Sequence, residues 1–190
     1  MTLDAGVAVR YGVDPRASQF TVQAFASGLI SAVAHSPKIA IRDWKADVVF
    51  DPPSLKNAKL KVTVKTSTFE VLDELREGDR REIHRVMNNE VLESNQYSEA
   101  IFDSTSITTE QLKETLHRVN VTGKLSLHGI TNAHAFFAQL AFGVDSFRAY
   151  GEFTLLQSDY GIKIASIAGG TLKLQDELKF TFYVVGRKSN

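Results

Sequence analysis

The amino-acid sequence predicts an all-β protein, folded as an antiparallel barrel of about eight strands with one accessory α-helix. Two stretches in which apolar and polar residues alternate strictly, 59–66 and 118–128, are the main observations behind this prediction. A period of two is typical of a strand with one dry face and one wet face. A charged stretch, 70–95, changes to a helical period and supplies the helix.

Length and composition fit a single domain over 1–190, with tails at 1–10 and 187–190. The chain has 190 residues, of which 43% are hydrophobic, enough for a folded core. Its 22 basic and 22 acidic residues give a formal net charge of zero, whereas nucleic-acid-binding proteins normally carry a basic excess. The chain has no Cys, so it forms no disulfide or thiolate metal site, which fits a reducing compartment.

The beginning of the chain does not resemble a secretory signal. Asp4 comes before any basic residue, and no apolar run of signal length follows Arg10. The stretch 17–37 carries no formal charge if His35 is neutral, but its Ser, Thr and Gln residues make it too polar to span a membrane. We therefore expect a cytoplasmic protein without a membrane span.

The first strand is expected at 11–14 and 18–25, interrupted by a turn at Pro15. Phe20, Val22 and Ala24 share one of its faces. The segment 29–44 is predicted as a short helix followed by a strand, with a break before Pro37 because proline disfavours helix in the residue that precedes it. Residues 45–51 continue as a strand.

The next strand has branched aliphatic residues on its inner face and lysines on its outer face, as in a sheet with water on one side. The following helix is amphipathic, because Ile83, Met87 and Val91 recur every four residues. Asp79 is followed by Glu82 three positions later, so we expect Asp79 to be the N-cap of a helix that begins after Gly78.

The stretch 118–128 places Val119, Val121, Gly123, Leu125 and Leu127 on its dry face, and Gly129 supplies the turn that ends it. Further strands are expected at 136–142, 147–155 and 178–185. Gly151 in the middle of a strand indicates a bulge or a sharp coil of the sheet.

Several motifs resemble those of the YceI-like family, and they occur in the family's order from 11 to 185. V-T-G-K-L-S-L-H-G-I-T at 121–131 is similar to V-x-G-x-L-x-x-H-G-V-T. Tyr97 with 100–104 is similar to Y-P-x-I-x-F-x-S, although Ser98 replaces the proline. S-D-Y-G-I at 158–162 is similar to S-D-F-G-I, with Gln157 in place of the family's arginine, and Ala17 stands where the opening motif has histidine.

The resemblance implies a bacterial, lipocalin-like barrel that binds a polyisoprenoid or fatty-acyl lipid in an apolar cavity, for storage, transport or protection. It implies a binding protein with no metal cofactor and no nucleic-acid partner, and it leaves open whether the chain forms a homodimer. The expected ligand-binding residues are Phe25, His35, Phe50, Val62, Val64, Phe102, Val121, Leu125, Phe153 and Phe180.

Two alternatives stay open. The first is an enzyme that acts on such a lipid with His35 or His128 as acid or base, although no acid–base pair stands at a fixed spacing. We interpret His128 as an outward-facing residue that bonds a neighbouring strand or turn, and Ser158-Asp159, which lacks G-x-S-x-G, as a turn. The second is a filled barrel with a stress-related or partner-binding role, since hollow and filled barrels both need inward apolar residues.

Overall fold

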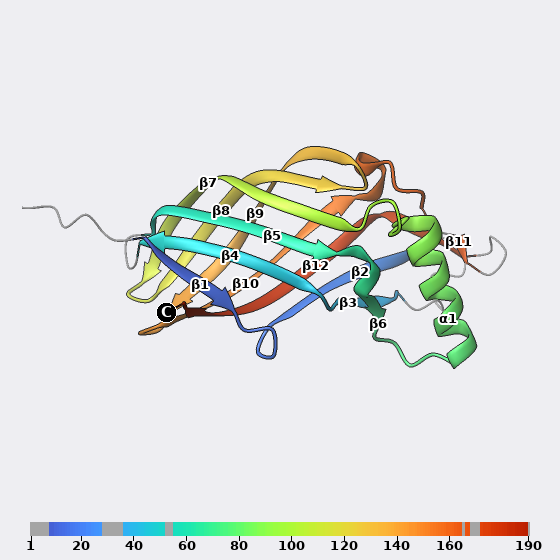
Figure 1. Ribbon diagram of the computed structural model, residues 1–190, viewed down its shortest axis with the longest axis horizontal. Helices are drawn as coiled ribbons and strands as arrows, with labels where there is room; N and C mark the ends of the chain where they lie inside the picture. Colours follow the sequence, from blue (N-terminus) through green and yellow to red (C-terminus); the bar gives the residue numbers. More distant parts are fainter. Residues whose placement is uncertain (1–7, 28–35, 52–54, 165, 168–171, 190) are drawn as a thin grey trace, which may run out of the picture.

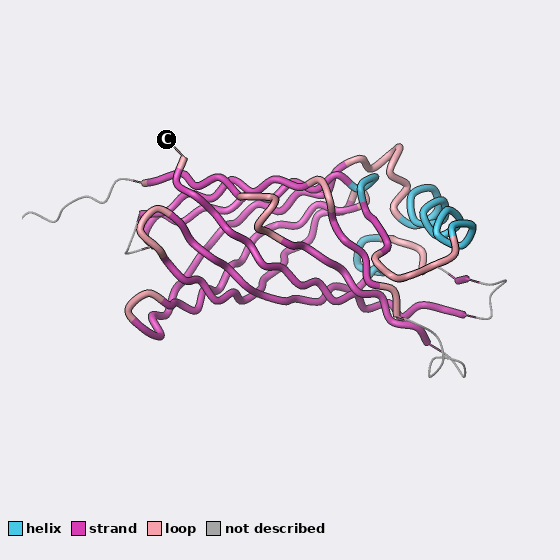
Figure 2. Tube along the Cα trace, turned by 90° about the horizontal axis from the view of Figure 1, so that it is seen from below, coloured by secondary structure: helices cyan, strands magenta, loops and turns pink. Residues whose placement is uncertain are grey.

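The computed structural model describes residues 8–27, 36–51, 55–164, 166–167 and 172–189. A closed antiparallel barrel forms its body, and helix α1 (Glu77–Val86) lies across one end of the barrel (Figures 1 and 2). The predicted all-β class and the barrel of eight strands with one accessory helix are confirmed.

The described chain contains the following strands: β1 Val9–Val13, β2 Gln19–Ser27, β3 Lys38–Ile41, β4 Trp44–Asp51, β5 Lys56–Lys65, β6 Phe69–Val71, β7 Glu99–Lys113, β8 Leu116–Leu127, β9 Ile130–Phe142, β10 Ser146–Leu156, β11 Ser166–Ile167 and β12 Leu172–Lys188. Helix α1 continues as a π-helical turn, η2 (Met87–Val91), and short 3₁₀ turns occur at η1 (Thr66–Thr68) and η3 (Gln157–Tyr160).

Eight positions around the barrel accommodate more than eight strands because three positions are shared by two successive strands. Both β1 and β2 pair antiparallel with β12, β1 along 186–188 and β2 along 173–183. In the same way β3 pairs with β2 while β4 pairs with β1, and β6 pairs with β3 while β5 pairs with β4. The sheet then continues through β7, β8, β9 and β10 to β12, which closes the ring against β1.

The barrel includes residues that the sequence analysis assigned to the two tails of the chain. Val9 and Arg10 pair with Phe50 and Val49 of β4, and residues 187–188 pair with β1. Three residue pairs between β1 and β12 thus complete the ring, so these short terminal segments are part of the barrel wall.

The helix begins earlier than the sequence predicts. Its N-cap is Arg76, so Gly78 and Asp79 lie inside the first turn, and the predicted N-cap role of Asp79 is wrong. The Asp79 carboxylate instead pairs with Arg76 at 3.3 Å, where its charge still favours the helix dipole. Strand β6 also lies partly within the stretch that was expected to be helical.

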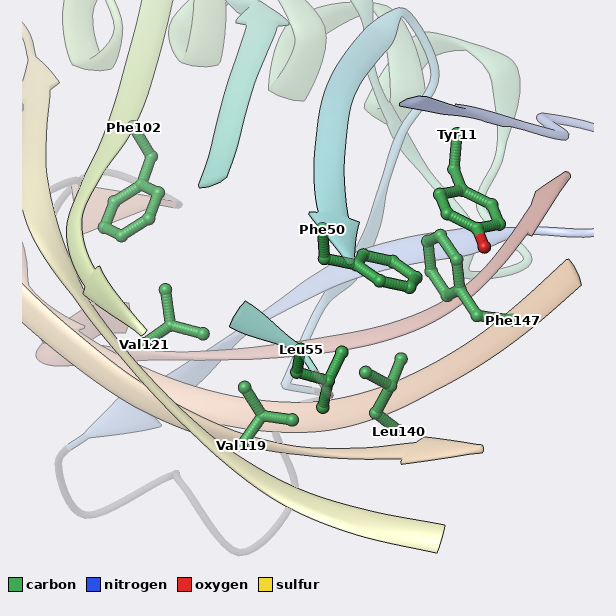
Figure 3. Packing of buried hydrophobic residues seen from close by; sticks show 8 residues of the cluster. All are labelled: Tyr11, Phe50, Leu55, Phe102, Val119, Val121, Leu140 and Phe147. Carbon is green, nitrogen blue, oxygen red and sulfur yellow. The ribbon is translucent and has the colours of Figure 1, made fainter. Parts of the chain in front are cut away.

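Aromatic rings fill the end of the barrel away from the helix (Figure 3). Tyr11 stacks on Phe50 with 4.4 Å between ring centroids, and it meets the edge of Phe147 at 5.5 Å. All three side chains are buried. These rings form an aromatic cluster at this end of the barrel, packed face to face and edge to face.

Gly151 does not mark a bulge, because the pairing of β10 with both neighbours runs through it without a register shift. A Cβ at this position would overlap the ring of Phe182 and lie 2.7 Å from the Phe137 carbonyl oxygen. The glycine therefore provides room for a neighbouring ring inside the barrel. No helix in the described part of the chain is long and apolar enough to cross a membrane.

Candidate functional site

The barrel interior contains two adjoining hollows. The deep chamber, about 190 Å³, reaches from the aromatic cluster, whose Phe50 and Phe147 line it, to the middle of the barrel. The mouth chamber, about 400 Å³, lies beneath α1 and η2. Phe20, Val64, Ala100, Leu125 and Phe153 line both chambers, so they form a waist between the two.

The deep chamber is almost entirely apolar. Among its described lining residues only Trp44, Lys59, Thr109 and His134 carry polar side-chain atoms. Its walls come from the inward-facing residues of the barrel strands, which follow from the period of two in the sequence. A cavity of this size with such walls stays dry and accepts apolar ligands, as engineered cavities of about 150 Å³ do.

The mouth chamber has an apolar floor and a partly charged cover. Ile83, Val86, Met87 and Val91 line it from the helical segment, so the predicted amphipathic helix turns its apolar face toward the barrel. No residue of α1 itself is fully buried. The helix therefore covers a hollow and does not complete a packed core.

Charged side chains at the edge of the helix neutralise one another. Arg85 donates two hydrogen bonds to the Glu82 carboxylate, at 2.8 and 2.9 Å, and one to Glu90 at 2.9 Å. These side-chain hydrogen bonds from Arg85 lower the pKa of Glu82, and the same contacts raise the pKa of the guanidinium. Arg85 is thus paired with both carboxylates at the edge of the helix.

Gln157 is the buried polar residue of the mouth chamber, with 3% of its surface exposed. Its side-chain amide donates to the carbonyl oxygens of Gln175 and Asp176, at 3.0 and 3.3 Å. Gln157 thus holds the end of β10 against β12.

Most of the residues expected to bind ligand meet at these chambers. The deep chamber is lined by seven of them, Phe50, Val62, Val64, Phe102, Val121, Leu125 and Phe153, and the mouth chamber by Phe180. Phe25 lines neither chamber, because it lies on the face of β2 opposite to Val22 and Ala24. His35 lies outside the described residues.

His128 is a structural residue of the rim. Its backbone is left-handed, with φ of 52°, at the turn that ends β8, so the alternation of the strand alone does not decide its direction. One ring nitrogen lies 3.2 Å from the Tyr160 carbonyl oxygen, and the other lies 2.8 Å from the Glu93 carboxylate. The interpretation that it bonds a neighbouring turn is confirmed, and it lines neither chamber.

The sequence reasoning overlooked His134, which lines the deep chamber. The signal was present: His134 has the same parity as Phe136, and extending the alternation two residues toward the N-terminus places it on the inner face. Its neighbours in this chamber supply no metal site, since the described residues include no group of three His, Asp or Glu side chains arranged for a metal.

The chain matches the family model described as the YceI-like domain over residues 11–185. Similar solved structures include Burkholderia cenocepacia BcnA, with a TM-score of 0.71 and 18% identity over 91% of this chain and 98% of that one. A polyisoprenoid binding domain from Saccharophagus degradans, implicated in plant cell wall breakdown, has a TM-score of 0.66 and 12% identity over 95% of this chain and 99% of the other.

A Campylobacter jejuni YCEI protein also shares the fold, with a TM-score of 0.61 and 18% identity over 83% of this chain and 87% of its own. At these identities the solved structures support the barrel fold. Comparison with curated proteins gives no match.

Proposed function

The chain belongs to the YceI-like family, and we propose that it binds an amphiphilic isoprenoid or fatty-acyl lipid inside its barrel. The observation that carries this proposal is the pair of apolar chambers, which adjoin along the barrel axis and narrow at a shared waist. This elongated hollow suits a chain-like apolar molecule better than a compact one.

The energetics favour such a ligand. Each methylene group moved from water into an apolar site contributes about 0.8 kcal/mol. A chain in the deep chamber also gives the surrounding rings the dispersion contacts that an empty hollow lacks. Because an aromatic cluster occupies the other end and the larger chamber lies beneath α1, we propose that the chain enters beneath α1 with its apolar end first.

A name among the structural relatives supports the isoprenoid class, since one of them is described as a polyisoprenoid binding domain. Storage, transport and protection of a lipid all require that its apolar part be removed from water, and the barrel provides this in each case. The cytoplasmic location expected from the sequence stays a prediction, which cell fractionation with an antibody against the native protein tests.

The proposal is tested first by extraction. Protein purified without detergent is extracted with chloroform and methanol, and the extract is examined by mass spectrometry beside an unrelated barrel protein purified in the same way. We expect about one lipid with a long apolar chain per protein molecule.

The extracted protein is then refolded and titrated with cis-parinaric acid, a fluorescent fatty acid. We expect saturable binding at one site, displaced by farnesol. An extract no richer than the control, together with no saturable binding of cis-parinaric acid, would overturn the proposal. A lipid that is chemically altered after incubation would favour the enzyme alternative.

A further inference from the structure

His134 places a polar atom in an otherwise apolar part of the deep chamber. It pairs across the sheet with Gly123 and lies on the same face of β9 as Phe136, so its side chain points into the barrel. Its Nε2 atom is buried and has no hydrogen-bond partner among the residues that the structure describes. Buried polar atoms in native proteins are seldom left unpaired, so each exception needs an explanation.

The position of His134 is well defined. Its ring meets the edge of Phe153 with 5.1 Å between centroids, and Phe153 is one of the waist residues shared by both chambers. A lipid chain that occupies both chambers must therefore pass the ring of Phe153 and, beside it, that of His134. The glycine opposite His134 brings no side chain that would occupy the same space.

The surroundings of His134 indicate whether a ligand group that bonds to it would be charged or neutral. Burial lowers the pKa of His134, so the imidazole is neutral at pH 7, with one nitrogen that donates and one that accepts. An ionised group beside His134 would lose its hydration. Lys59 is the charged residue among the described lining of the deep chamber, and it is exposed to solvent. At the mouth, Arg85 is already paired with two carboxylates, so that end does not attract an anionic headgroup either.

We propose that His134 hydrogen-bonds a neutral, oxygen-bearing group of the bound lipid, such as a hydroxyl, a carbonyl or an ester, at the waist of the barrel. This inference rests on the proposed function and narrows it. The ligand class becomes neutral oxygenated isoprenoids or acyl lipids, with the polar oxygen held inside the barrel.

The test uses two probes with the same carbon skeleton: farnesol, which has a hydroxyl group, and farnesene, a hydrocarbon. Their affinities are measured by displacement of cis-parinaric acid from the delipidated full-length protein. The wild type is compared with His134→Leu, His134→Gln and Phe136→Leu, the last being a control for changes in chamber shape. The ratio of the two affinities is compared between variants, because the difference in probe hydration is the same for every variant and cancels in that comparison.

We expect His134→Leu to weaken farnesol relative to farnesene by about two- to tenfold, the range that one neutral hydrogen bond supplies. His134→Gln, which keeps a hydrogen-bonding group, should retain most of the preference. Phe136→Leu should change both affinities by the same factor. In the absence of ligand, His134→Leu should melt at the same temperature as the wild type or higher, because it removes an unpaired polar atom.

If His134→Leu binds both probes with the same affinity ratio as the wild type, the inference about His134 is overturned and the proposed lipid binding stands. If the wild type binds neither probe, both the inference about His134 and the proposed lipid binding are overturned. If His134→Leu did not fold, the test would use His134→Gln. Loss of the preference for farnesol over farnesene in His134→Gln would contradict a hydrogen-bonding role. Retention of that preference, together with an equal change of both affinities in Phe136→Leu, would support one.

Discussion

At the scale of single residues, glycines on the inner wall decide where the aromatic rings lie. A Cβ at Gly123 would come within 2.5 Å of the Phe102 ring, and Cβ atoms at Gly151 and Gly186 would overlap the rings of Phe182 and Phe147. Each ring therefore lies over a neighbouring strand at the point where that strand has no side chain. Rings held flat against the wall leave space along the barrel axis, which is how a barrel rich in phenylalanine remains hollow.

This arrangement predicts that Gly151→Ala is destabilising. The new methyl group would meet the Phe137 carbonyl oxygen at 2.7 Å as well as a ring, and backbone atoms of a central strand cannot move aside cheaply. Overpacking of this kind costs about 1–3 kcal/mol in the free energy of unfolding. Gly78→Ala is the control, since nothing lies within 4 Å of its added Cβ. In α1 the control should stabilise by about 0.4–1 kcal/mol. Urea unfolding measures both, and equal effects would contradict the prediction.

The buried imidazole of His134 predicts a pH dependence of stability. Its folded-state pKa is lowered by desolvation, so below about pH 6.5 the unfolded chain binds a proton that the folded chain resists. The free energy of unfolding should therefore fall as pH falls from 6.5 toward the lowered pKa. His134→Leu lacks this contribution, so its stability should decrease less between pH 7.5 and pH 5. Parallel pH profiles for the two proteins, from urea titrations, would show that His134 is not the group responsible.

At the scale of elements, polar contacts anchor both ends of the helical segment that covers the mouth chamber. Arg80 donates to the carbonyl oxygens of Val71 and Asp73, at 2.7 and 3.0 Å, near the start of α1. Beyond η2, the Glu93 carboxylate lies 2.8 Å from His128 on the barrel rim. Because α1 itself contains no fully buried residue, we expect it to open at a lower free energy than the barrel strands.

Removing one anchor should accelerate lipid release. Arg80→Ala deletes two hydrogen bonds from a charged donor, and the loss of about 1.5 kcal/mol corresponds to roughly tenfold faster dissociation. Arg81→Ala is a matched control, because Arg81 makes only a weak pair with Glu77 at 4.0 Å. Transfer of cis-parinaric acid from protein to lipid vesicles gives both rates. Equal rates for the two variants would mean that the lipid leaves without moving α1.

The elements also show what the sequence could predict. Strand positions and inner faces followed from the period of two, because one face of each strand is apolar and the other meets water. The split of single barrel positions into β1 with β2, or β3 with β4, was not predictable, because it depends on pairings with distant strands that leave no local pattern. The prediction that Phe25 binds ligand fails for a local reason. Its position in the alternation of β2 already places it on the face opposite to Val22.

At the scale of the whole molecule, the barrel has two unlike ends. One holds the aromatic cluster of Tyr11, Phe50 and Phe147, and the other is covered by a helix that carries no fully buried residue of its own (Figures 1 and 3). Under the proposed function, this asymmetry favours one route and one orientation for the ligand. The sequence alone does not distinguish a hollow barrel from a filled one, because the number of inward apolar residues does not reveal how their rings pack.

A single substitution at the waist separates a hollow barrel from a filled one. Ala100 lines both chambers, so a phenylalanine there should enter free space and block the passage between them. We expect Ala100→Phe to lose most of the retained lipid while the delipidated protein keeps its melting temperature. Ala135→Phe adds the same ring on the outer face, where Ala135 is exposed, and should change neither quantity.

Ala100→Phe should also differ from Ala135→Phe in how much a ligand stabilises the folded protein. Farnesol at 100 times its dissociation constant should stabilise the wild type and Ala135→Phe by about 2.7 kcal/mol, because it binds only the folded state. Ala100→Phe should gain much less, since its binding site is obstructed. If instead Ala100→Phe were strongly destabilised without ligand and still stabilised by farnesol, the waist would be packed and the ligand would lie elsewhere. Thermal melts of the three proteins with and without farnesol therefore test the hollow barrel and its single route together.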